Sequence, residues 1–479
     1  MIQVKTSIHD RFSVEFKINF SGKEQQHRLF KMNSWLFIPY SLNINASTYT
    51  KEQFYQDVKS NVRLKTPQFT LQQLSDAEAQ TVRNLSAAVQ NYATAQSSAC
   101  LQDLEFHIKM YVAIYKSALR DETKALQAVK EAAFNPEAWK AQLTAMRKIV
   151  RHYREIMRNS SESSSDVALI FQYGDEYLSH LTELHAVRLM RSAATMSVKG
   201  IEDIRQEIKS LIIDEHQYKI DQGYAHFSLS SVAENRDMFQ HQNLLKKYIE
   251  SALYLKSDSQ PDGTAAKEIT LSFAAGLAML ISMLIALPFQ KYLGQYPILI
   301  FVILVVAYMF KDRIKEYARN RFAHRLKSRF FDMKNKVFFR GKEVVNIKEG
   351  MDFIDDSKTP DEVRQARNRS DLENRIPLEE IILYRKQVEI DNELLGQQYE
   401  YRYDGINDIT RIHLQNYTTK MDDPEINVAM LDGDGVQTMS IPRVYNLHIV
   451  LQCVAGEMLE YHCFRLMMCR DGIVECAEI

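Results

Sequence analysis

Two apolar runs constrain the fold of this chain more than any other feature of its sequence. Residues 269–289 contain no ionisable side chain, and residues 292–310 contain none that is charged at neutral pH. The hydrocarbon core of a bilayer requires about 20 apolar helical residues, and each run supplies about that number. Residues 269–310 are therefore predicted to form a transmembrane helical hairpin.

The charges beside the runs predict an orientation. The connection between them contains one basic residue, Lys291, whereas residues 311–342 contain twelve Lys or Arg and three acidic residues. Positive charge favours the cytoplasmic side, so both termini are expected there. No organelle-targeting pattern is present, which makes the bacterial inner membrane the default location.

The basic segment at residues 311–342 has the period of an amphipathic helix. It is interpreted either as an anchor that continues as a stalk, or as a helix that lies on anionic lipid headgroups. Nucleic-acid binding is not favoured, because proximity to a membrane would explain the charge. The candidate membrane-surface residues are Lys311, Arg313, Lys315, Arg319, Arg321, Arg325, Lys327 and Arg329.

Small residues recur every fourth position of the first run, at Ala274, Ala278, Ser282 and Ala286. Such a stripe allows close approach of another helix. It is expected either to seat the second run or to mediate self-association. Neither run contains Asp, Glu, Lys, Arg or His, so a substrate or proton pathway is not expected.

The N-terminal residues predict a small module over residues 1–68. Residues 12–20 alternate strictly between apolar and polar, which indicates a strand with one buried face. Residues 29–42 supply a second strand, and the two are expected to form a hairpin. Thr50 with Gln53 has the capping-box spacing and predicts a helix to about residue 64.

Residues 69–256 have the helical period, and the chain contains only 15 glycines, which disfavours glycine-rich phosphate loops. A helical bundle or coiled-coil-like region is predicted, with a helix starting at Asn135 and Pro136. Residues 257–268 are interpreted as a polar linker. A solvated helix face is favoured over a phosphate site at Arg147, Arg151, Arg154 and Arg158.

Residues 343–479 predict a mixed region followed by a β-sandwich or meander. Short β-rich runs follow residue 410, with turn signals at residues 432–435 and at Asp471 and Gly472. Four cysteines lie in this part at spacings unlike those of a zinc site, so buried packing is expected of them. These are Cys453, Cys463, Cys469 and Cys476.

No catalytic signature, cofactor motif or metal site is found. His180 and His185 flank Glu183, but their spacing of five places the two rings on different helix faces. The sequence therefore predicts a membrane-anchored α+β interaction or scaffold protein. Its expected partners are the lipid bilayer and other proteins, and a homo-oligomer is a further hypothesis. A membrane-tethered enzyme or ligand sensor and an oligomeric membrane-perturbing effector are the alternatives.

Overall fold

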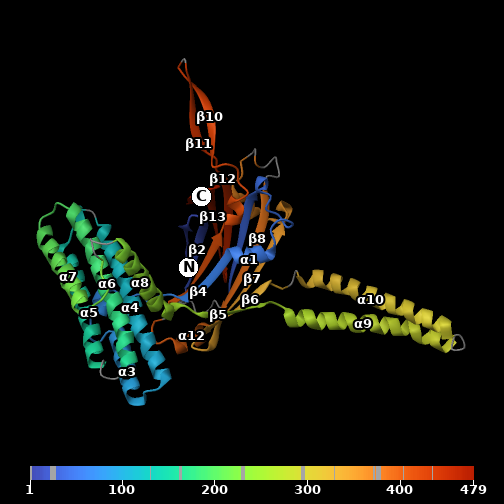
Figure 1. Ribbon diagram of the computed structural model, residues 1–479, viewed down its shortest axis with the longest axis horizontal. Helices are drawn as coiled ribbons and strands as arrows, with labels where there is room; N and C mark the ends of the chain where they lie inside the picture. The colour runs from blue at the N-terminus through green and yellow to red at the C-terminus, as the bar shows by residue number, and fades with distance from the viewer. Residues whose placement is uncertain are drawn as a thin grey trace.

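The computed structural model describes residues 3–21, 29–129, 131–160, 164–227, 232–292, 297–327, 330–370, 373, 379–402, 404–433 and 435–479. A β body lies at the centre, a helical bundle lies on one side of it, and two arms project from it (Figure 1). One arm is a pair of helices and the other is a two-stranded hairpin. The class is α+β.

The β body contains an eight-stranded sheet in the order β14-β13-β12-β3-β8-β7-β6-β5 and a four-stranded sheet in the order β1-β2-β9-β4. Neighbouring strands run antiparallel throughout. The strands of the larger sheet are β3 (Leu29–Pro39), β5 (Lys256–Pro261), β6 (Met333–Phe339), β7 (Lys342–Ile354), β8 (Glu379–Ile390), β12 (Tyr445–Ala455), β13 (Met458–Cys469) and β14 (Gly472–Glu478). Those of the smaller sheet are β1 (Gln3–Asp10), β2 (Ser13–Ser21), β4 (Val58–Leu64) and β9 (Gly405–His413).

The alternating residues at the N-terminus form β2, whose apolar side chains are buried as the pattern predicts. The ring of Phe16 contacts that of Phe464 on β13 at a centroid distance of 5.7 Å, so the core lies between the two sheets. The predicted hairpin between β2 and β3 is wrong. β2 pairs with β1 and β9, whereas β3 pairs with β8 and β12, because strands from both ends of the chain build one body.

The region predicted as one helix up to residue 64 divides into two elements. Helix α1 (Lys51–Asp57) starts at the predicted capping box of Thr50 and Gln53. The chain then becomes β4, which pairs with β9. The shorter helices that remain are α2 (Leu71–Leu74), α11 (Asp361–Arg367), α12 (Asn392–Gln398) and α13 (Gln415–Thr418).

The long helices of the bundle follow the predicted helical period. They are α3 (Gln80–Ala95), α4 (Ser98–Gln127), α5 (Pro136–Ser160), α6 (Ser165–Thr195), α7 (Ile201–Asp221) and α8 (Val232–Glu250). Helix α5 begins at the predicted Pro136, where the side chain of Asn135 accepts a hydrogen bond from the backbone N–H of Glu137 at 3.0 Å. The buried Trp139 and Tyr153 project from α5 into the bundle core.

The described residues of the two apolar runs lie in a pair of helices, α9 (Thr264–Tyr292) and α10 (Pro297–Lys327), that form the long arm in Figure 1. Both helices extend beyond the runs. Helix α9 includes Lys267 and Glu268, and α10 continues through much of the basic segment. The residues predicted as a linker before them, 257–268, belong largely to β5 and to the start of α9.

The predicted transmembrane hairpin is contradicted by these helices. Within the part of the chain that the structure describes, no helix has both the length and the apolar character needed to cross a membrane. The predictions of a two-span membrane anchor at residues 269–289 and 292–310, and of an integral protein of the bacterial inner membrane with both termini cytoplasmic, are therefore wrong. The first run lies inside the longer helix α9, and the described part of the second run from Pro297 lies inside α10, which continues into charged residues.

Candidate protein-docking site

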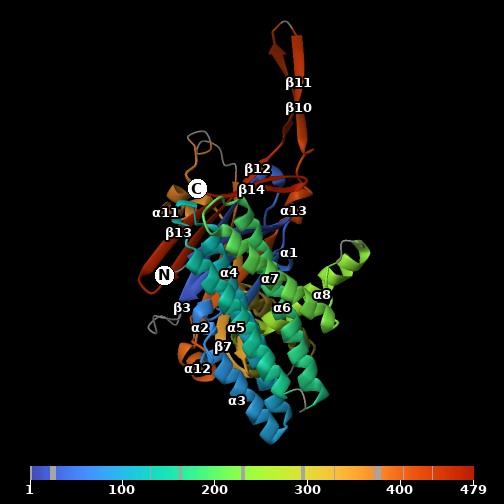
Figure 2. The ribbon, with the colours of Figure 1, turned by 90° about the vertical axis from the view of Figure 1, so that its left-hand side faces the viewer.

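Among the described residues, the strands β10 (Glu425–Asp432) and β11 (Gly435–Pro442) pair only with each other. They form an antiparallel hairpin that projects from the β body, as both views show (Figures 1 and 2). The predicted turn at residues 432–435 falls between them, where Gly433 has a φ of 63° and residue 434 lies outside the described residues. A two-stranded hairpin is only marginally stable in water unless other elements cover it. A covering surface would therefore stabilise this arm.

The two faces of the hairpin differ in chemistry. Directly opposed residues share a face of an antiparallel pair. The register pairs Ile426 with Ile441 and Val428 with Met439, and Met430 lies next along the same face. The opposite face carries Asn427 paired with Ser440 towards the base and Ala429 paired with Thr438 near the middle of the hairpin.

The tip of the hairpin is apolar on the second face too. Leu431 pairs with Val436 there, and these residues are 81% and 71% exposed. On the apolar face, Ile426, Met430 and Met439 are also exposed. Exposed apolar clusters on proteins mark interaction sites. This cluster combines an apolar face with a tip that is apolar on both sides.

Polar contacts fix the base of the hairpin to the β body. The hydroxyl of Tyr445 donates to Asp422 at 2.8 Å, and the guanidinium of Arg443 lies 3.1 Å from the same carboxylate. Arg470 pairs with Asp423 at 3.1 Å. These contacts hold the strands where they leave the body, so the arm is presented in a defined direction.

A second candidate site lies where α4 meets the β body. Asp103, His107 and Glu400 place ligand atoms within 4.8 Å of one another, an arrangement that could hold a metal ion. The Nε2 atom of the buried His107 lies 2.7 Å from Glu400, and its Nδ1 atom lies 2.8 Å from the hydroxyl of Tyr401. Burial lowers the pKa of His107, while Glu400 and Asp103 act in the opposite direction.

A guanidinium already neutralises the carboxylates of this cluster. Arg340 lies 2.8 Å from Asp103 and 3.4 Å from Glu400, and it stacks over the ring of Phe106. The turn between β6 and β7 positions Arg340, because Arg340 and Gly341 both have positive φ, as in a type I′ turn. A metal ion would compete with this cation for the same oxygens. The arrangement fits an ion-paired junction between α4 and the β body better than a metal site.

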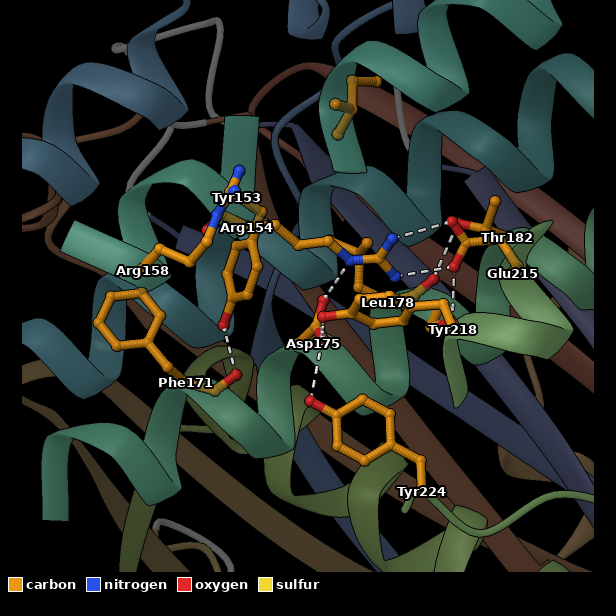
Figure 3. A network of polar contacts seen from close by, with 12 residues as sticks. Tyr153, Arg154, Arg158, Phe171, Asp175, Leu178, Thr182, Glu215, Tyr218 and Tyr224 are labelled. Atoms are coloured by element: carbon orange, nitrogen blue, oxygen red, sulfur yellow. Dashed lines mark hydrogen bonds and ion pairs between the residues drawn. The ribbon is translucent and has the colours of Figure 1, made fainter. Parts of the chain in front are cut away.

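A buried polar network joins α5, α6 and α7 inside the bundle (Figure 3). Arg154 lies 3.0 Å from Asp175 and 2.8 Å from Glu215, and its guanidinium stacks over the ring of Tyr218. Asp175 also accepts hydrogen bonds from Tyr218 and from Tyr224, at 2.7 and 2.9 Å. Burial opposes the charge of Arg154, but Asp175 and Glu215 outweigh it and raise the pKa of Arg154. These mutual contacts favour a structural role.

The arginine face predicted on α5 is therefore solvated only in part. Arg147 pairs with Asp214 near the surface, whereas Arg154 is only 16% exposed in its side chain and belongs to the network. The spacing places these arginines on one helix, but the carboxylates that neutralise Arg154 come from α6 and α7. Nothing in the sequence near Arg154 reveals them.

The predicted membrane-surface residues lie along α10. Lys311 is half-buried, with its ammonium 4.0 Å from the ring centroid of Tyr308, and Arg313, Lys315 and Arg321 are exposed. Arg329 lies outside the described residues, as do the side chains of Arg319, Arg325 and Lys327. The described basic residues of this set are thus neighbours along α10, and the structure does not gather them into a pocket within the described residues.

The small-residue stripe of α9 lies against α10. Ala274 and Ala278 are buried, and the hydroxyl of Ser282 donates to the backbone carbonyl of Ala307 on α10 at 3.2 Å. The side chain of Ala286 lies outside the described residues. The described residues of the stripe on α9 are therefore in contact with α10.

The C-terminal cysteines lie on β12, β13 and β14, three neighbouring strands of the larger sheet. Burial raises the pKa of the Cys453 thiol to about 12 and that of Cys463 to about 11. Metals are bound by the thiolate, so high pKa values oppose metal binding. Cys469 and Cys476 are half-buried. All four thiols are free within the described structure.

The apolar face of the β10–β11 hairpin has a sequence pattern that the sequence analysis did not use. Ile426, Val428 and Met430 alternate with polar or small residues before the turn, and Met439 and Ile441 do so after it. This alternation predicts an amphipathic hairpin, but it does not predict that the hairpin projects from the β body. No protein-family model, curated protein or solved structure matches the chain.

Proposed function

We propose that this chain is a protein-docking module whose recognition element is the β10–β11 hairpin. The observation that carries the proposal is an apolar face that no other described element covers, held on an arm away from the body and made of Ile426, Val428, Met430, Met439 and Ile441. Methionine side chains adapt to irregular apolar surfaces, and two of them lie on this face. The apolar tip extends the surface to the end of the arm.

The dimensions of the hairpin favour insertion into a groove. Each strand has eight residues. At the usual strand rise and spacing, one face covers roughly 270 Å². A stable interface buries about 800 Å² on each partner. A flat contact with one face is too small, so the partner is expected to enclose both sides of the tip.

Charge specifies the partner further. Residues 425–442 include Glu425, Asp432 and Asp434 and contain no Lys or Arg. Complementary potentials steer association and select partners. The expected partner is a protein with an apolar groove whose rim carries Lys or Arg, and the groove receives the tip with Leu431 and Val436 inside.

Site-specific photo-crosslinking tests this proposal. A photoreactive residue would replace Met439 on the apolar face or, as the matched control, Thr438 on the opposite face of the same strand. Crosslinking would be performed in cells that express the full chain. We expect one protein to crosslink strongly from position 439 and weakly from position 438, through residues that line a groove with a basic rim.

Two outcomes would contradict the proposal. Equal crosslinking from positions 438 and 439 would show that the apolar face does not direct binding. Crosslinking to a second copy of this chain would instead show that the hairpin mediates self-association.

A further inference from the structure

Three strands of the β body each carry one charged residue at an inward position. On β8, Lys386 lies between Tyr384 and Val388 on the buried face. Glu349 has the corresponding place on β7, and Asp408 on β9. All three residues are buried, and the side chains of Lys386 and Asp408 are fully so. Charged residues are rarely buried completely, so their convergence calls for a physical reason.

The register and the stacking of the sheets bring these groups together. Glu349 and Lys386 are directly opposed on neighbouring strands of the larger sheet, and Asp408 reaches them from the smaller sheet. The Nζ atom of Lys386 lies 2.5 Å from Oδ2 of Asp408 and 3.4 Å from Oε1 of Glu349. The three strands thus deliver an amine, a carboxyl group and a second carboxylate to one point.

The amine of Lys386 and the carboxyl group of Asp408 are in direct contact inside the body. Both side chains are fully buried, and Nζ and Oδ2 form an ion pair at 2.5 Å. An amine held this close to a carboxyl group is within reach of the carboxyl carbon. Reacting groups held this close in one geometry gain a large rate advantage.

Burial favours the protonated form of Asp408 that such a reaction needs. Burial raises the pKa of Asp408, against the opposing effect of Lys386. In a medium of low dielectric constant, a neutral amine and a neutral acid avoid the cost of two buried charges. Proton transfer from the Lys386 ammonium to the Asp408 carboxylate produces that pair.

Glu349 is held where it can move protons between the two groups. Tyr384 donates a hydrogen bond to Oε1 of Glu349 at 2.8 Å, and Asn335 donates to Oε2 at 3.0 Å. These contacts fix the carboxylate beside Nζ of Lys386. A carboxylate so placed can act as a general base and then as a general acid.

We propose that Lys386 and Asp408 form an intramolecular isopeptide bond that joins the two sheets, with Glu349 as the catalytic proton carrier. The neutral amine of Lys386 attacks the Cγ atom of the protonated Asp408. Glu349 accepts a proton from Nζ and returns it to the departing hydroxyl group. The Nζ–Cγ bond forms, the Cγ–O bond breaks, and one water molecule leaves.

The cross-link would connect β8 to β9 across the core. Strand β8 belongs to the eight-stranded sheet and β9 to the four-stranded sheet, so backbone hydrogen bonds of a sheet do not connect them. A covalent link between them would restrict the unfolded chain and so stabilise the body, as other cross-links do. The bond needs no oxidant and no cofactor.

Mass spectrometry of the full-length purified chain tests the proposal. We expect the denatured protein to weigh one water molecule less than the sequence requires, and tryptic digestion to yield a peptide containing Lys386 joined to one containing Asp408. Glu349→Gln and Lys386→Met should each restore the full mass. Lys348→Met, which alters a lysine on β7 outside the cluster, should retain the loss of water.

The wild-type measurement decides the question even where a core variant does not fold. A wild-type chain at its full sequence mass, with separate peptides for Lys386 and Asp408, would overturn the proposal. A cross-link that persists in Lys386→Met would overturn the assignment of the amine. A cross-link that forms equally in folded Glu349→Gln would overturn the role of Glu349.

Discussion

Replacing Arg154 by methionine provides a sharp test of the buried network in the bundle. Methionine keeps much of the apolar stem and removes the guanidinium. The change leaves Asp175 fully buried and Glu215 nearly so without their cation. Removing one partner of a buried ion pair costs about 3–5 kcal/mol, because the remaining charge stays uncompensated.

The remaining contacts limit the cost of this substitution. Asp175 retains hydrogen bonds from Tyr218 and Tyr224, and Glu215 retains one from Ser179 at 2.7 Å. We therefore expect a loss of about 4 kcal/mol in the free energy of unfolding of the bundle, and not twice that value for two carboxylates.

Urea unfolding followed by tryptophan fluorescence measures this loss. The chain contains two tryptophans, and Trp139 is buried in α5 of the bundle, whereas Trp35 lies in the β body. A Trp35→Phe background therefore isolates the signal of the bundle. Arg147→Met is the matched control, because Arg147 and its partner Asp214 are 37% and 54% exposed in their side chains.

An exposed ion pair of this kind contributes about 0–1 kcal/mol. The reasoning is refuted if Arg154→Met lowers the free energy of unfolding by no more than Arg147→Met does. Neutralising Asp175 and Glu215 as Asn and Gln in the Arg154→Met chain should recover part of the loss.

Two further predictions concern pH and packing. Burial lowers the pKa of both His185 and His448 from 6.5 to about 4, so the unfolded chain binds more protons between these values. The free energy of unfolding, measured by urea unfolding at a series of pH values, should be fully retained above pH 6.5 and fall towards pH 4. The fall should be at most about 1.4 kcal/mol per pH unit for each histidine. If the free energy of unfolding of His185→Gln falls with pH as steeply as that of the wild type, this assignment is contradicted. Gly174→Ala should destabilise the bundle by about 1–3 kcal/mol despite the better helix propensity of alanine, because the new methyl group would meet the hydroxyl of Tyr153. Gly396→Ala, where a methyl group meets nothing, should not lower the melting temperature, and equal effects at the two glycines would refute the packing argument.

The alternation and capping patterns in the sequence predicted individual strands and helices better than they predicted which strands pair with each other. The alternation at residues 12–20 identifies β2 and its buried face, and the Thr50 capping box marks the start of α1. Alternation defines which side of a strand is buried but not which strand lies beside it. The pairing of β2 with β9, which lies nearly 400 residues later in the chain, could therefore not be predicted from the alternation.

The candidate sites were partly visible in the same patterns. Lys386 interrupts an alternating apolar face, as does Asp408, so each position could have been recognised as inward-facing. Their meeting depends on the stacking of two sheets, which neither segment encodes alone. The apolar runs of α9 and α10 were correctly read as helical, but hydropathy over a run did not reveal where each helix begins and ends.

The affinity of the full chain for the protein crosslinked at position 439 tests the docking function most directly. The measurement compares the wild-type chain with Met439→Lys and Thr438→Lys, which place the same charge on opposite faces of β11. We predict that Met439→Lys raises Kd at least tenfold, or about 1.4 kcal/mol, while Thr438→Lys changes Kd less than threefold. Equal changes in Kd for the two variants would contradict the account.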